Sequence, residues 1–170
     1  LTTRTYTMPN FKLAIFFSLL LSNQGFSQDS YWNIDEALDS IPSDSVSGAI
    51  WGHPFDLLQA TFNDAALVLE SIPIIPNTKS GSHIAIFVDV VNGPGQWKVS
   101  PNTEGRLPGV HVRYRSGDRL DMRILMLNYD YSMNLIIDET SEDQVRGRIH
   151  LSLPDYKLSY IVGSFTADRT

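Results

Sequence analysis

The sequence predicts an all-β fold: an antiparallel β-sandwich of about nine or ten strands, with a β-barrel as the alternative. Beyond residue 45, apolar and β-branched runs of four to eight residues alternate with short turn segments. The links are mostly too short for the helical crossovers that parallel strands require. The 170 residues include no cysteine, so the core alone must hold the fold together, which is feasible at this length.

The beginning of the chain has the layout of a secretory signal peptide. Met8 is followed by a single cation, Lys12, and by an apolar run from Leu13 to Leu21. A small-x-small triplet ends at Ser27, and we expect cleavage after it. A membrane-spanning helix needs roughly 20 residues, so a retained anchor is the lesser alternative. We therefore expect a secreted or periplasmic protein with no membrane span after cleavage, and the lack of cysteine favours a bacterial one.

The segment 28–45 is expected to be a linker that carries one short helix. Asn33 could cap this helix, and Ile34, Ala37, Leu38 and Ile41 recur at helical spacing before Pro42 stops it. The pattern covers about two turns, which is too short for a helix to be stable without packing against something else.

The β-domain is expected to span 46–170. Strands are predicted at 46–51, 55–62, 66–72, 84–91, 96–99, 110–115, 120–128, 132–137, 145–153 and 159–167. The residues between them, such as the segments 92–95 and 154–157, favour tight turns.

Alternation along the strand at 145–153 assigns its two faces. Gly147, Ile149, Leu151 and Leu153 would face the core. Arg146, Arg148, His150 and Ser152 would then form the solvent face that is ordinary in an antiparallel sheet. The strand at 159–167 would send Ile161, Gly163, Phe165 and Ala167 one way, and Tyr160 and Val162 the other, so it would be covered in part on both sides.

Two further strands offer cations on a polar face. His111 and Arg113 alternate with core residues at 110–115. At 120–128, Leu120, Met122, Ile124 and Met126 would share one face and leave Arg123 on the other. If these strands neighbour the one with Arg146 and Arg148, a basic strip could bind an anion or a sugar acid. The plainer interpretation, which we favour, is that acids on adjacent strands pair with these arginines.

Aromatic residues provide another candidate surface. Trp51 would face away from the core if Val46, Gly48 and Ile50 face inward, and a surface tryptophan could stack on a sugar. The alternative, which average burial of tryptophan favours, places Trp51 under the short helix or in a second core layer.

Catalytic and metal-binding motifs are weak. The four histidines show neither an HExxH pattern nor helical pair spacing, and a triad of His83, His111 and His150 depends on strand order. The serines beside glycines lack the strand–turn–helix context of a nucleophile elbow. No cofactor and no metal site is predicted. The formal charge of −6 argues against nucleic-acid binding.

These observations favour a non-enzymatic binding or accessory module for a carbohydrate, a peptide or an envelope partner. Alternatives are a secreted hydrolase that uses strand-borne histidines and carboxylates, and a barrel that carries an apolar ligand. The candidate ligand-binding residues are Trp51, His111, Arg113, Arg146, Arg148 and His150.

Overall fold

The computed structural model describes residues 31–63, 65–71, 81–88, 93–115 and 122–170, and this part of the chain is all-β. The predicted leader at 1–27 lies outside the described residues. The strands are β1 (Ser47–Ile50), β2 (His53–Asn63), β3 (Ala66–Ser71), β4 (Gly81–Phe87), β5 (Gly95–Val99), β6 (Gly109–Arg115), β7 (Met122–Leu127), β8 (Ser132–Thr140), β9 (Gln144–Ser152) and β10 (Tyr160–Arg169). Within the described segments no helix is long and apolar enough to cross a membrane.

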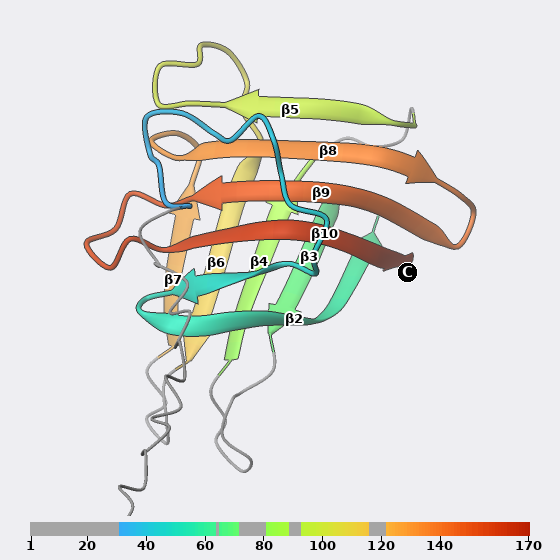
Figure 1. The fold of residues 1–170 in the computed structure, drawn as a ribbon, viewed down its shortest axis with the longest axis horizontal. Coiled ribbons are helices and arrows are strands. Elements are labelled where there is room, and N and C mark those ends of the chain that lie inside the picture. Colours follow the sequence, from blue (N-terminus) through green and yellow to red (C-terminus); the bar gives the residue numbers. More distant parts are fainter. Residues whose placement is uncertain (1–30, 64, 72–80, 89–92, 116–121) are drawn as a thin grey trace, which may run out of the picture.

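All ten strands belong to one curled sheet in the order β5-β8-β9-β10-β1-β2-β3-β4-β6-β7. Neighbours in this order are antiparallel. Strands β5, β8, β9, β10, β1 and β2 run across the view in Figure 1, and β3, β4, β6 and β7 cross behind them. The end of β10 also pairs in parallel with β2 at Thr61 and Phe62, so the sheet folds back on itself there.

The main core fills the space between the two layers. Its largest fully buried side chains come from both layers and include Phe55, Leu67, Leu69, Ile84, Ile86, Leu135, Ile149 and Leu151. A smaller apolar cluster lies on the opposite, outer face of the front layer, where Ala49, Tyr160 and Val162 pack with Ile41. Strand β10 is therefore covered on both faces, as the sequence predicts.

The strand prediction is confirmed for all ten segments, with ends that differ by a few residues. The predicted inward faces of β6 and β9 are confirmed too, because Val110, Val112, Ile149 and Leu151 are buried in the main core. Regular alternation of apolar and polar side chains carries enough information to place these strands.

One facing assignment, at β7, is wrong. Ile124 and Met126 lie on the outer face with 48% and 63% of their surface exposed, whereas Leu125 and Leu127 pack against the core. Four consecutive large apolar residues satisfy either register, so the packing partners decide the face rather than the pattern.

The assignment of His150 and Ser152 to a solvent face is also wrong. Both residues point outward from β9, but both are fully buried. They are covered by residues 31–45, which lie across the outer face of β8, β9 and β10 and are drawn in blue in front of these strands in Figure 1. We call residues 31–45 the strap.

The predicted helix within the strap is not confirmed, since the described residues contain no helix and 31–45 runs as a series of bends. The main-chain groups that a helix would pair internally are bonded to the sheet instead. The Asn33 amide donates to Ser152 Oγ at 3.1 Å, and the Leu38 carbonyl accepts from Asn134 Nδ2 at 2.8 Å. Asn33 keeps a cap-like role, because its Oδ1 accepts the amides of Asp35 and Glu36.

Candidate functional site

A groove of about 530 Å³ lies on the outer face of the front layer, beside the strap. Its floor follows the strand register, in which Ser47 is flanked by Val162 of β10 and by Asp56 of β2. The next row is Tyr160, Ala49 and Pro54. Small side chains in the middle strand and larger ones on both sides make this part of the sheet concave.

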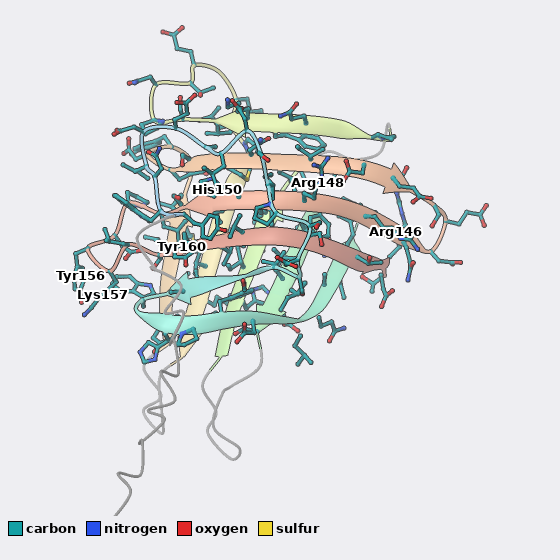
Figure 2. All side chains as sticks on the ribbon, viewed as in Figure 1. Arg146, Arg148, His150, Tyr156, Lys157 and Tyr160 are labelled. Atoms are coloured by element: carbon teal, nitrogen blue, oxygen red, sulfur yellow. The ribbon has the colours of Figure 1, made fainter. Side chains whose placement is uncertain are left out.

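The strap provides one wall of the groove through Tyr31, Pro42 and Asp44. The rings of Tyr31 and Tyr160 lie 6.2 Å apart between centroids and are tilted by 35°, so an aromatic corner forms where the strap meets β10. Figure 2 shows Tyr160 at the start of β10. The site therefore depends on two segments more than a hundred positions apart in the sequence.

Two exposed carboxylates, Asp44 and Asp56, are the acidic groups among the lining residues. The main chain at Asp44 is fixed, because its carbonyl accepts the Ser164 amide at 2.7 Å. Aromatic side chains together with carboxylate acceptors in one groove suit a neutral, hydroxyl-rich or cationic ligand, and the carboxylates repel an anion.

The β1–β2 hairpin turn closes one end of the groove at Gly52. Trp51 and Gly52 both have positive φ, +54° and +76°, and these two residues form the turn. The Trp51 amide donates to Ser159 Oγ at 2.8 Å, and its ring meets the ring of Tyr156 edge-on at 5.8 Å. Trp51 is half-buried and packs against the main core, so the second of the two predicted placements, a core layer, describes it better than a free surface.

His150 binds the strap through both of its ring nitrogens. The Leu38 amide donates to Nδ1 at 3.2 Å, and Nε2 lies 2.7 Å from the carbonyl oxygen of Tyr31. Since Nδ1 accepts, the ring proton sits on Nε2 and is donated to Tyr31. Burial lowers the pKa of His150 below its ordinary value of 6.5, against the smaller opposing effect of the bond to Tyr31.

Further hydrogen bonds join the strap to the outer face of the sheet. Ser132 Oγ donates to the Asn33 carbonyl, and the Trp32 indole donates to the Leu153 carbonyl at 3.1 Å. At the edge, Lys98 of β5 bonds to Asp39 at 2.6 Å, and this bond raises the pKa of Lys98. A row of buried polar residues thus holds an irregular segment of chain.

The basic strip that we considered as the lesser alternative is not assembled by the described side chains of Arg113, Arg146 and Arg148. Arg148 makes a two-pronged contact with Asp138 at 3.0 and 2.7 Å, and Arg146 lies 3.5 Å from Glu139. The Arg148 guanidinium lowers the pKa of Asp138. The pairing with neighbouring acids that we favoured from the sequence is therefore what the structure has, and Figure 2 shows both arginines spaced along β9.

His111 and Arg113 lie elsewhere. They are on the outer face of β6, which is separated from β9 by β10, β1, β2, β3 and β4 in the sheet. His111 is half-buried and its ring contacts Phe87 edge-on at 4.6 Å. The six candidate residues therefore do not converge on one site.

The histidine triad does not assemble either. His83 and His111 are diagonal neighbours on β4 and β6, whereas His150 lies under the strap on the other layer. In the described part of the chain, no group of three histidines, aspartates or glutamates could hold a metal ion.

Comparisons of the chain with family models, with curated proteins and with solved structures give no match. The groove and the strap were missed from the sequence because they depend on strand order. The useful signal would have been the run of three small residues, Ser47, Gly48 and Ala49, which is unusual in a strand that lies between two others.

Proposed function

We propose that this protein is a non-enzymatic binding module of the cell envelope or the extracellular space, and that the groove beside the strap binds a neutral carbohydrate. The observation that carries the proposal is the lining of the groove: the half-buried ring of Tyr31 lies beside the largely buried Tyr160, and the exposed carboxylates of Asp44 on the strap and Asp56 on β2 line the same groove. The predicted leader at 1–27 supports export to that location.

The chemistry of the lining favours a sugar. The half-buried ring of Tyr31 can pack against the C–H groups of a pyranose, with the largely buried Tyr160 supporting it, and carboxylates accept hydrogen bonds from the sugar hydroxyl groups. The volume of about 530 Å³ is in the range of small-ligand sites and fits a short oligosaccharide. A polyanionic glycan is disfavoured by Asp44 and Asp56, and a cationic peptide is the competing ligand.

A hydrolase is supported less well. A glycosidase keeps one carboxyl protonated by placing it in apolar surroundings, whereas Asp44 and Asp56 are both exposed. The histidines give no acid–base pair in the groove, because none of them is among its lining residues. The groove therefore supports binding without chemistry.

A barrel with an apolar ligand inside is also supported less well. Large side chains such as Phe55, Leu135 and Ile149 fill the space between the two layers. We regard the curled sheet as a sandwich whose two layers belong to one sheet, with the ligand on the outside.

Isothermal titration of the protein with neutral oligosaccharides, acidic oligosaccharides and cationic peptides tests this function. We expect a neutral oligosaccharide to bind. Its affinity should fall by about tenfold or more in Asp56→Asn, because this variant loses one charged hydrogen-bond acceptor. Ser47→Trp should abolish binding by filling the floor. Glu142→Gln and Thr166→Trp, at exposed positions that are not among the groove residues, are the matched controls. Preferential binding of acidic glycans, or equal loss in the controls, would contradict the proposal.

A further inference from the structure

The ring of His150 is bonded to the strap through both of its nitrogens. Nδ1 accepts the Leu38 amide at 3.2 Å, and Nε2 donates to the Tyr31 carbonyl at 2.7 Å. The residue is 0% exposed, so water cannot replace either bond while the strap is in place. This pair of bonds can form only with a neutral ring, because a protonated ring has no acceptor.

We propose that proton uptake by His150 releases residues 31–41 of the strap from the outer face of β8, β9 and β10. Release removes Tyr31 from the wall of the groove and separates the Tyr31–Tyr160 corner. The consequence for the ligand, its loss in mildly acidic surroundings, rests on the proposed function. The release itself does not.

Protonation sets two donors against each other, since Nδ1–H would point at the N–H of Leu38. It also places a positive charge in a buried site with no counter-ion. Among the described residues, no ion pair involves His150. Such a charge is costly to bury, and lifting the strap exposes the ring to water.

The groups around His150 do not offset this effect. Along β9 its neighbours on the same face are Ser152 and Arg148, and the guanidinium of Arg148 is already paired with Asp138. Its register partners are Asn134 of β8 and Val162 of β10, which carry no charge. The strap also carries the Tyr31 phenol and the exposed acids Asp35, Glu36, Asp39 and Asp44. The remaining titratable or charged groups of the packed strands are Tyr160, Asp168 and Arg169 of β10, Glu139 of β8, Arg146 of β9 and Lys98 of β5.

The two ends of the strap differ in how they are held. The stretch 31–41 is held by His150, by neutral bonds such as the one from Asn134 to the Leu38 carbonyl, and at the exposed edge by the bond from Lys98 to Asp39. The stretch 43–45 is bonded to β10, where Ser164 Oγ donates to the Ser43 carbonyl at 2.6 Å and the Ser164 amide donates to the Asp44 carbonyl at 2.7 Å. These bonds involve no titrating group, so the strap should lift from its beginning and stay attached near Asp44.

The sign of the pH dependence follows from linkage. Above pH 6.5, the ordinary pKa of histidine, the ring is neutral in both states and the strap keeps its full stability. Below that value the released state binds a proton and the docked state does not. Docking should then weaken by about tenfold per pH unit, until the pH reaches the lowered pKa of docked His150.

Hydrogen exchange measured by NMR tests the proposal on the purified protein. The reporters are the Leu38 amide and the Trp32 indole N–H, which belong to the lifting part, and the Ser164 amide, which belongs to the attached part. We expect the protection factors of the first two to be constant above pH 6.5 and to fall about tenfold per unit below it. Ser164 and core amides such as Ile149 should stay protected.

His150→Gln keeps a donor and an acceptor at this position but does not titrate, so its protection factors should be independent of pH over the same range. His111→Gln, which changes a half-buried histidine of β6, is the matched control and should behave as the wild type. The ring titration of wild-type His150 is a check that needs no variant, because the loss of protection must level off at its pKa. Flat protection in the wild type, an unchanged loss in His150→Gln, or a parallel loss at Ile149 would each overturn the proposal.

Discussion

The amide of Leu38 donates a hydrogen bond of 3.2 Å to Nδ1 of His150, across 112 positions of sequence. This bond joins the strap to the middle of the front layer. It explains why a histidine in a strand of alternating polar residues is buried, and why the strap has no helix.

Asn134 is expected to be a second anchor of the strap. In Asn134→Ala the Leu38 carbonyl loses its donor in a buried place, which should lower the free energy of unfolding by about 1–3 kcal/mol. Urea unfolding at pH 7.5 measures this. Gln96→Ala, which removes only the exposed partner of Asn134, should cost less than about 0.5 kcal/mol. Equal costs would show that the bond to the strap is unimportant.

Gly163 is expected to be irreplaceable where the strap joins β1. A Cβ at this position would lie 2.6 Å from the Asp44 carbonyl oxygen and 2.8 Å from that of Ser45, and φ is +138°. Gly163→Ala must displace backbone, so we expect a loss of about 3 kcal/mol or more. Gly105→Ala is the matched control, because φ is +104° there with no atom within 4 Å, and only about 1 kcal/mol of backbone strain should appear. Thermal unfolding of both variants separates the cost of the backbone clash from the cost of the positive φ.

Tyr131 should make stability fall at high pH. It is fully buried, its hydroxyl donates to the Pro108 carbonyl, and burial raises its pKa to about 12. A raised pKa means that Tyr131 stays protonated up to a higher pH in the folded protein than in the unfolded chain. Its contribution is therefore complete below pH 10 and is lost as the pH rises towards 12. Urea unfolding at pH 9 and at about pH 11 should show a steep loss in the wild type and a smaller one in Tyr131→Phe. The same slope in both proteins would contradict this.

The Arg148–Asp138 pair should contribute little. Its side chains are 38% and 43% exposed, so Arg148→Met should cost less than about 1 kcal/mol at neutral pH. The pKa of Asp138 is lowered from 3.8 by Arg148, so the contribution is present above that pH and is lost as the pH falls below it. The difference between the two proteins should thus vanish in acid. A cost of several kcal/mol would mean that Arg148 acts on the strap as well as on Asp138.

The sequence carries more information about strands than about what covers them. All ten strands could be predicted from the alternation of apolar and polar residues and from the turn residues between them, because both signals are local in the sequence. The burial of His150 does not follow, since the parity of β9 assigns it only to the outer face. What covers that face is a segment 112 positions away, measured from Leu38.

The groove, like the burial of His150, depends on contacts between segments that are far apart in the sequence. Ser47, Asp56 and Val162 form one row only because β1 lies between β2 and β10, and no local pattern encodes that order. The assignment at β7 failed for a related reason, since Ile124 and Leu125 are equally apolar and only packing distinguishes them. The pairing of Arg146 and Arg148 with acids was predictable, because both acids lie in the adjacent strand of the same hairpin.

We propose that the groove between the strap and the β1–β2 hairpin binds a neutral carbohydrate, and this binding can be measured residue by residue. The most direct measurement is a titration of ¹⁵N-labelled protein with a neutral oligosaccharide, followed by backbone chemical shifts. We expect saturable shifts confined to Ser47, Ala49, Gly52, Asp56 and the strap near Tyr31, with β6 and β7 unaffected. Shifts centred on His111 and Met126, or none at millimolar ligand across the panel of neutral sugars, would contradict it.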